Sequence, residues 1–277
     1  MKNAIKRMIQ FVLRKSKVNS VLFGKNKGLK LYYSDDLNLD MVLGFHEPNT
    51  FEVFDMFIKE GMTVVDIGAN VGYFTRFLSK KVGTKGFVYA FEPIPATFKS
   101  LQATISLNNI SNVIAVNKAS SDHNGTVTMY LSLTHYMASL DVNWASREGG
   151  ETEVPCITLD SFSETTGKAP DFIKMDIEGG GVYALKGMYN IIRKHEPVLF
   201  LESHTPAEDD AIGQALSLVP YDVYRVGSTT PVKHLDNNYS DMYGIYGTII
   251  GIPKSKKYLI GDFNPNQFQK KRFGQRD

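Results

Sequence analysis

Two acidic residues and two glycines in the first half of the chain have the types and spacing to hold a nucleoside. Asp66 ends a short apolar run, and Gly68 and Gly72 follow it with the spacing G-x-x-x-G. Glycine lets the backbone approach a ligand that a Cβ would exclude. A carboxylate at Asp66 suits a ligand with a cationic end. Glu92, about 20 residues beyond the glycines, is placed to accept hydrogen bonds from both ribose hydroxyls.

The elements that must position these residues are a strand, a tight turn and a helix. Residues 62–67 form an apolar, β-branched run that is too short for a helix, and Phe74, Phe77 and Leu78 then fall at helical spacing. Residues 86–91 read as the next strand. Open α/β sheets bind ligands at the carboxyl ends of such strands. The spacing differs from the G-x-G-x-x-G of dinucleotide phosphate loops, so an NAD-dependent oxidoreductase is a distant alternative.

Three motifs give the chain a family resemblance. Residues 65–75 read Val-Asp-Ile-Gly-Ala-Asn-Val-Gly-Tyr-Phe-Thr, residues 91–93 read Phe-Glu-Pro, and residues 172–179 read Phe-Ile-Lys-Met-Asp-Ile-Glu-Gly. Together they resemble the FkbM-type methyltransferases, which are class I enzymes that use S-adenosylmethionine and mostly methylate oxygen. The similarity runs from about residue 45 to 204.

The resemblance implies an α/β, Rossmann-like fold with a seven-stranded sheet and helices on both faces. We expect an N-terminal helical extension in addition. The cofactor would lie over the glycine turn, and its adenine would meet the end of the third strand near Asn117 and Ser120. The expected cofactor-binding residues are Asp66, Gly68, Asn70, Gly72, Tyr73, Glu92, Pro93, Asn117, Ser120 and Asp176.

Methylation of a hydroxyl requires a base, because an alcohol is a weak nucleophile until its proton is accepted. If the strands that end near residues 66, 176 and 202 are adjacent, one edge of the sheet brings together Asp176, Glu178, Glu202 and His204. His204 suits a general base because its unperturbed pKa is near neutrality. Asp176 is a near equal if burial and a neighbouring carboxylate raise its pKa. The catalytic candidates are therefore His204, Asp176 and Glu202.

The same side chains suggest a second chemistry. Carboxylates and a histidine could hold Mg²⁺, which some O-methyltransferases use to orient an acceptor. We treat a magnesium-assisted reaction as the less favoured alternative and assign no metal ligand.

Substrate contacts are expected from residues around the predicted cofactor site. Glu47 precedes a helix and Glu178 follows the Asp176 strand. A long polar stretch, residues 132–152, joins two predicted strands, and long connections inside compact domains tend to be lids or binding loops. His135 and Tyr136 in this stretch are further candidates, although a plain surface loop explains the stretch equally well.

One departure from the family pattern affects this prediction. The family usually reads Asp-Val/Ile-Glu-Gly-Ala-Glu, whereas residues 176–181 here read Asp-Ile-Glu-Gly-Gly-Gly. Gly180 and Gly181 therefore replace an alanine and a carboxylate. If that carboxylate is catalytic, the chain would be weakly active or a non-catalytic protein that binds S-adenosylmethionine; if it only starts the helix, the loss costs about 0.3–1 kcal/mol.

Composition limits the class of protein to which the chain can belong. The chain has 277 residues, 43% hydrophobic and 22% charged, with a net charge of +2 that gives no argument for a nucleic-acid partner. A single cysteine, Cys156, fits a reducing compartment. No run approaches the ~18 apolar residues of a membrane span. We predict an N-terminal amphipathic helix or extension (1–28), a methyltransferase domain (29–255) and a C-terminal tail (256–277).

Residues 1–18 place apolar and basic residues at alternating faces of a helix. Such a helix can lie on an anionic membrane, but packing on the domain or on a second subunit is the interpretation we favour. The predicted location is cytoplasmic, with peripheral contact to the inner face of the membrane as an alternative, and a homo-oligomer is a further alternative. The predicted function is S-adenosylmethionine-dependent O-methylation of a sugar, glycan or small-metabolite hydroxyl.

Overall fold

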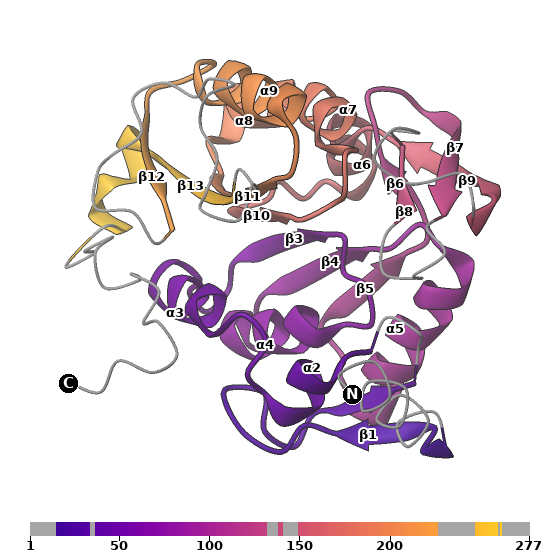
Figure 1. Ribbon diagram of the computed structural model, residues 1–277. Coiled ribbons are helices and arrows are strands. Elements are labelled where there is room, and N and C mark those ends of the chain that lie inside the picture. Colours follow the sequence, from indigo (N-terminus) through magenta and orange to yellow (C-terminus); the bar gives the residue numbers. More distant parts are fainter. Residues whose placement is uncertain are drawn as a thin grey trace.

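The computed structural model describes residues 15–33, 37–131, 138–140, 149–226, 247–259 and 261 (Figure 1). Its centre is a seven-stranded sheet in the order β12-β13-β11-β10-β3-β4-β5. The strands are β3 (Thr63–Ile67), β4 (Phe87–Phe91), β5 (Val113–Val116), β10 (Phe172–Met175), β11 (Val198–Ser203), β12 (Tyr221–Arg225) and β13 (Gly247–Pro253). β13 runs antiparallel to both of its neighbours, and the other pairings in the sheet are parallel.

This strand order confirms the class I methyltransferase fold expected from the sequence. The predicted adjacency of the strands that end near residues 66, 176 and 202 is also confirmed, because β10 lies between β3 and β11. The antiparallel closing pair is present as β12 and β13. The strand predicted at 86–91 is β4, shorter by one residue.

Helices cover both faces of the sheet (Figure 1). One layer contains α2 (Leu39–Leu43), α3 (Pro48–Phe57), α4 (Tyr73–Val82) and α5 (Pro95–Leu107), and the other contains α6 (Leu159–Thr166), α7 (Gly181–Lys186), α8 (Tyr189–His195) and α9 (Pro206–Leu216). Successive strand residues point to opposite faces. Val64 therefore joins the core beneath α3 and α4, while Val65 joins the core beneath α7, α8 and α9.

A smaller sheet lies beside the carboxyl end of β5. Its strands are β6 (Ala119–Ser120), β7 (Gly125–Leu131), β8 (Ala138–Ser139) and β9 (Glu151–Ile157), in the order β6-β9-β7-β8. The predicted substrate loop 132–152 lies largely between β7 and β9. Of that loop, residues 132–137 and 141–148, with His135 and Tyr136, are outside the described residues.

The described residues near the N-terminus include a hairpin. β1 (Val18–Ser20) pairs antiparallel with β2 (Lys30–Tyr32), so the boundary expected at residue 28 crosses one hairpin. Residues 1–14, which carry most of the predicted amphipathic helix, are outside the described residues. At the other end, a 3-10 helix, η2 (Lys254–Leu259), follows β13, and residues 262–277 of the predicted tail are also outside. No helix in the described ranges is long and apolar enough to cross a membrane.

Candidate active site

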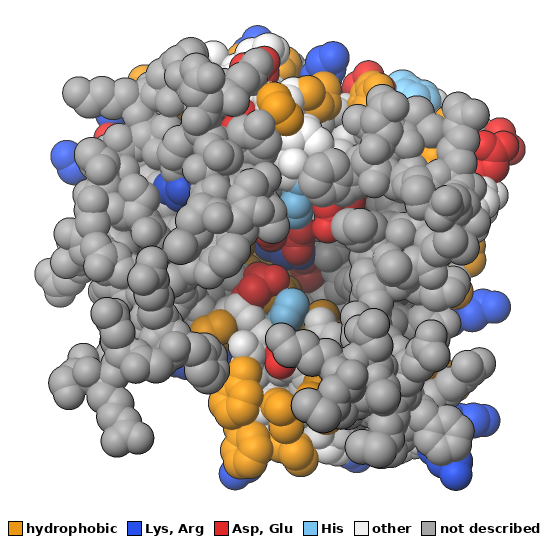
Figure 2. Space-filling model, viewed as in Figure 1, with side chains coloured by type: hydrophobic (Ala, Val, Ile, Leu, Met, Phe, Trp, Pro, Cys, Tyr) orange, Lys and Arg blue, Asp and Glu red, His pale blue; other side chains and the backbone are white. Residues whose placement is uncertain are grey.

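A cavity of about 1060 Å³ opens at the carboxyl ends of β3, β4, β10 and β11. This is the edge at which α/β sheets bind ligands. Small-molecule sites usually measure about 300–1000 Å³, so the cavity has room for a cofactor and part of an acceptor. Figure 2 looks into the hollow, where acidic and histidine side chains gather. The predicted residues among those that line it are Gly68, Asn70, Tyr73, Glu92, Pro93, Ser120, Asp176, Glu47, Glu178, Glu202 and His204.

The turn after β3 is built around glycine. Gly68 has φ +79°, and a Cβ added there would lie 2.0 Å from the carbonyl oxygen of Asp176. Asn70, in the same turn, donates its backbone N–H to Oε2 of Glu92 over 3.1 Å, and Ile94 donates its own to Oε1 over 2.9 Å. These bonds hold the Glu92 carboxylate at the rim of the cavity. The predicted juxtaposition of the glycine turn and Glu92 is therefore confirmed.

Asp66 does not face the cavity, which corrects the expectation that it receives a cationic ligand. Its side chain is fully buried, and its Oδ2 accepts a hydrogen bond from Thr75 Oγ1 over 2.7 Å. Its Oδ1 lies 3.4 Å from Nζ of Lys174. The reason is the register of the sheet, because β10 places Lys174 directly beside Asp66 and paired residues share a face. The cation that Asp66 meets belongs to the protein.

Lys174 is a cavity residue that the sequence prediction missed. Its side chain is 3% exposed, its Nζ donates to the carbonyl oxygen of Gly68 over 3.0 Å, and it lies 3.6 Å from Asp176 Oδ2. The two carboxylates outweigh burial and raise the pKa of the Lys174 ammonium. The signal was present in the sequence, because a lysine inside a buried apolar strand must find counter-charges.

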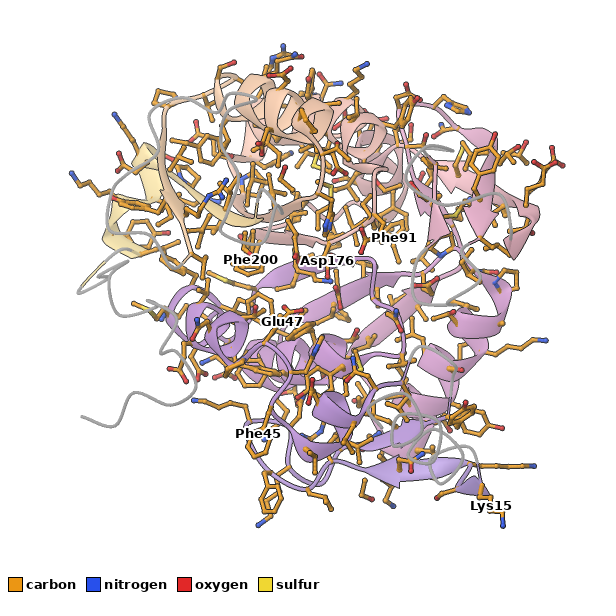
Figure 3. All side chains as sticks on the ribbon, in the orientation of Figure 1. Lys15, Phe45, Glu47, Phe91, Asp176 and Phe200 are labelled. Carbon is orange, nitrogen blue, oxygen red and sulfur yellow. The ribbon has the colours of Figure 1, made fainter. Side chains whose placement is uncertain are left out.

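Asp176, Glu202 and His204 meet at the ends of β10 and β11, as predicted. Each can place one oxygen or nitrogen within 4.8 Å of the other two. His204 Nε2 lies 3.4 Å from Asp176 Oδ1, and its Nδ1 lies 3.5 Å from Glu178 Oε2. Figure 3 labels Asp176 above Glu47, on the opposite side of the hollow.

The charges within this group determine which of its members can act as the base. Burial lowers the pKa of His204, but its hydrogen bond to Asp176 and the charge of Glu178 outweigh burial and raise that pKa to about 9. At neutral pH His204 is therefore an imidazolium and lacks the lone pair that a base needs. The sequence analysis treated His204 and Asp176 as near equals, and its argument for His204 rested on an unperturbed pKa that this environment changes.

Asp176 is a weak base for a different reason. Burial opposes its ionisation, yet Lys174 first and His204 next hold the pKa of Asp176 well below its usual range. Glu202 behaves oppositely, because the charge of Asp176 and then burial raise its pKa well above the usual range. A carboxylate whose pKa is raised takes up a proton more readily than an ordinary carboxylate does. Of the two carboxylates, Glu202 is therefore the stronger base.

Glu47 stands on the opposite wall in a strained backbone. It precedes α3 with φ 44°, a left-handed conformation that is uncommon for a residue other than glycine. Its Oε2 accepts from Thr50 Oγ1 over 3.1 Å, and its Oε1 lies 3.2 Å from His46 Nε2. Burial first and the charge of Asp176 second raise its pKa. Backbone strain of this kind clusters at functional sites, which agrees with the substrate role predicted for Glu47.

In this arrangement cations of the protein already contact Asp176, which the magnesium alternative would use as a ligand. Both oxygens of Asp176 already face cations of the protein, Oδ1 towards His204 and Oδ2 towards Lys174. A pair of internal cations satisfies the charge that a metal would otherwise balance. We therefore interpret the group as one that shares protons.

The carboxylate missing at Gly181 is supplied from another helix. Glu208 of α9 is fully buried, and its Oε1 accepts from the Gly181 N–H over 2.9 Å. Its Oε2 accepts from the His204 N–H over 2.9 Å. A Cβ at Gly181 would lie 2.8 Å from Glu208 Oε1, so the glycine makes room for this carboxylate. The departure at residue 181 thus leaves the start of α7 with an acidic partner.

We expect Glu208→Ala to destabilise the protein by about 2–4 kcal/mol, because two buried N–H groups lose their acceptor. Thermal or urea unfolding measures the loss. The matched control is Asp210→Ala, an exposed acidic residue on the same helix, which should change stability by less than about 0.5 kcal/mol. Equal stability of the two variants would show that Glu208 does not support this part of the site.

Two predicted cofactor residues, Asn117 and Gly72, are not among the residues that line the cavity, and each has a structural role. Asn117 donates its side-chain amide to the carbonyl oxygens of Glu92 and Pro93, over 2.9 Å each, and so fixes the turn after β4. Gly72 begins α4, and a Cβ there would lie 2.9 Å from Leu101 of α5. Ser120 differs, because it lines the cavity and its buried hydroxyl has no hydrogen-bond partner among the described residues.

Comparison with known proteins decides the family. The sequence profile of the methyltransferase FkbM domain matches residues 66–234, which is more than half of the chain. The chain belongs to the FkbM methyltransferase family. The matched region includes the glycine turn, Glu92, Lys174, Asp176 and the Glu202–His204 segment. The resemblance stated from the three motifs is therefore confirmed.

Individual relatives of this FkbM-family chain are distant. Methyltransferase 1 of Beauveria bassiana is 28% identical over 144 residues, which are 45% of this chain and 57% of that protein. Hexuronic acid methyltransferase AglP of Haloferax volcanii is 30% identical over 161 residues, 57% of this chain and 63% of that protein. The chain thus spans about three fifths of the length of these two relatives. A solved FkbM methyltransferase from Methylobacillus flagellatus is 20% identical with a TM-score of 0.47, over 69% of this chain and 43% of that one.

Proposed function

We propose that this protein is an S-adenosylmethionine-dependent O-methyltransferase whose acceptor is a sugar hydroxyl. The observation that carries the proposal is the Glu202 carboxyl, which has a raised pKa and lines a cavity that also presents Glu92. Membership of the FkbM family supports methyl transfer. The similarity to a hexuronic acid methyltransferase supports a sugar acceptor.

The residues on the β3–β4 side of the cavity fit an adenosine-bearing cofactor. Gly68 lets the turn after β3 pass directly against the backbone of Asp176, and Glu92 is held at the rim with its carboxylate fixed by two backbone N–H groups. Ser120 adds a buried hydroxyl with unused hydrogen-bonding capacity. In this proposal Glu92 accepts hydrogen bonds from the ribose hydroxyls, and Ser120 contacts the adenine. When bound, S-adenosylmethionine supplies a methyl group activated by its sulfonium.

On the β10–β11 side of the cavity, side chains of the protein act on the acceptor hydroxyl. There Glu202 would accept the proton of the acceptor hydroxyl as that hydroxyl is methylated. Asp176 keeps the pKa of Glu202 high, while Lys174 and His204 hold Asp176 ionised. A base contributes about 10²–10⁴-fold to such a step.

The charge around Glu202 favours a hydroxyl over a carboxylate as the acceptor. Four carboxyl groups line this part of the cavity, at Glu47, Asp176, Glu178 and Glu202. Lys174 and the His204 imidazolium are the cations among them. The excess of acidic groups favours the cationic sulfonium and opposes an anionic acceptor oxygen, because like charges in a partly buried site repel.

The test is methyl transfer from labelled S-adenosylmethionine to glycans that contain hexuronic acid and to the same glycans after carboxyl reduction. We expect label in both, in a form that resists mild alkali, because an O-methyl ether survives conditions that hydrolyse a methyl ester. Label that only unreduced glycans accept and that alkali releases would show that the acceptor is a carboxylate. Loss of activity with a chelator, restored by Mg²⁺, would favour the magnesium-assisted alternative.

A further inference from the structure

Two exposed phenylalanines lie side by side at the foot of the cavity. Phe23 is 53% exposed and Phe45 is 59% exposed, and their rings stack with centroids 6.0 Å apart and an interplanar angle of 7°. Leu22, beside them in the chain, is 48% exposed. We call these three residues the aromatic patch. Figure 3 places Phe45 below Glu47, and Figure 2 shows hydrophobic side chains at that place, beneath the hollow.

The patch is rigidly built. Gly24 and Gly44 bring two loops into direct backbone contact, since a Cβ on Gly24 would lie 2.3 Å from Gly44 O. A Cβ on Gly44 would lie 2.0 Å from Phe23 O. Leu22 also donates its N–H to the carbonyl oxygen of Val42 over 2.9 Å. The phenylalanines are therefore held towards solvent by the backbone, although large apolar side chains seldom gather on a surface without a partner.

The segment that carries Phe23 is strongly basic. Residues 15–33 contain five lysines, Lys15, Lys17, Lys25, Lys27 and Lys30, and no acidic residue. All five are exposed. Lys25 pairs with Asp55 of α3, whereas no ion pair within the described residues involves Lys27 or Lys30. With the whole chain at +2, the rest of the protein has a net charge of −3, so this segment is basic relative to the remainder of the chain, and Lys25 and Lys27 are its lysines nearest to Phe23 in the sequence.

We propose that the aromatic patch and its lysines dock the protein on an anionic membrane surface. Aromatic side chains settle at the boundary between headgroups and acyl chains, and lysines near the surface are attracted to anionic lipids. The charge complementarity selects a lipid surface over a second copy of the chain, whose patch would carry the same lysines. Docking would place the mouth of the cavity, lined by His46 next to Phe45, against the bilayer surface. The proposal does not depend on the reaction catalysed.

Co-sedimentation of the full chain with vesicles tests the proposal. We expect binding to phosphatidylcholine vesicles that contain phosphatidylglycerol, little binding to phosphatidylcholine alone, and weaker binding as salt is raised. The double variant Phe23→Ser/Phe45→Ser should bind about tenfold more weakly. Lys27→Gln/Lys30→Gln should lose about fivefold for each charge removed.

Matched controls lie on η2, at the other end of the central sheet. Tyr258→Ser removes an aromatic side chain that is 77% exposed, and Lys257→Gln removes an exposed lysine. Both should bind as wild type, and thermal unfolding should show that all variants are folded. The lysine pair keeps the test valid if the phenylalanine variant unfolds. Equal binding of wild type to both kinds of vesicle would overturn the proposal, as would a wild-type dimer, in the absence of vesicles, that Phe23→Ser/Phe45→Ser abolishes.

Discussion

Glu202→Gln is expected to lower kcat by about 10²–10⁴-fold, with a much smaller change in the affinity for S-adenosylmethionine. The amide keeps the size of the side chain but cannot take up the proton of the hydroxyl that is methylated. In the wild type, the rate should rise with pH through the raised pKa of Glu202 and then level, because only the ionised carboxylate is a base. The variant should lose that rising limb. Initial rates with a saturating methyl donor across the pH range provide the measurement.

Glu47→Gln is the matched control for that experiment. Glu47 also lines the cavity and also has a raised pKa, and its charge adds to the pKa shift of Glu202. We expect Glu47→Gln to keep a rising limb and to move it to lower pH, because the loss of a neighbouring negative charge makes Glu202 easier to ionise. If Glu47→Gln removes the limb and Glu202→Gln retains it, the assignment of the base is wrong.

Lys174→Met is expected to destabilise the fold by about 3–5 kcal/mol, because it leaves Asp66 buried without a cation. Asp66 is fully buried and Lys174 is 3% exposed, so water cannot replace the lost charge. Unfolding in urea measures the change. The substitution should also impair activity, since Asp176 loses one of its two cationic neighbours.

A double variant separates the charge pair from simple packing. Asp66→Asn/Lys174→Met removes both charges and keeps the side-chain volumes close to the originals. Replacing both partners of a buried pair is often close to neutral, so the double variant should be more stable than Lys174→Met alone. If the losses in the free energy of unfolding from the two single substitutions instead add in the double variant, the Asp66–Lys174 contact does not stabilise this part of the structure.

The seven-stranded fold was predictable from the family resemblance of the three motifs, and the positions of the rim residues were predictable from apolar runs and glycine spacing. The direction of a side chain was not. Asp66 was placed correctly at the end of β3, but whether it faces ligand or Lys174 depends on the register between β3 and β10. That register joins residues more than a hundred positions apart and leaves no local trace in the sequence.

The charge states of the three candidate bases could not be predicted for a related reason. His204 has a pKa near neutrality only in isolation, and its pKa of about 9 comes from Asp176 and Glu178 on the neighbouring strand end. The partner of Gly181 was equally hidden, because Glu208 lies 27 residues further along the chain, beyond α8 and β11. The sequence thus identified that Asp176, Glu202 and His204 meet, whereas Lys174, Glu208 and the charge states followed only from the structure.

The most direct test of the central claim is calorimetric titration of S-adenosylmethionine into the wild type, Glu92→Gln and Glu164→Gln. We expect saturable binding to the wild type and to Glu164→Gln, whose substituted side chain is exposed on α6. We also expect about 10–100-fold weaker binding to Glu92→Gln, because a charged acceptor of the ribose hydroxyls is lost. Absence of binding to the wild type, tight binding of NAD instead, or unchanged affinity in Glu92→Gln would contradict this claim.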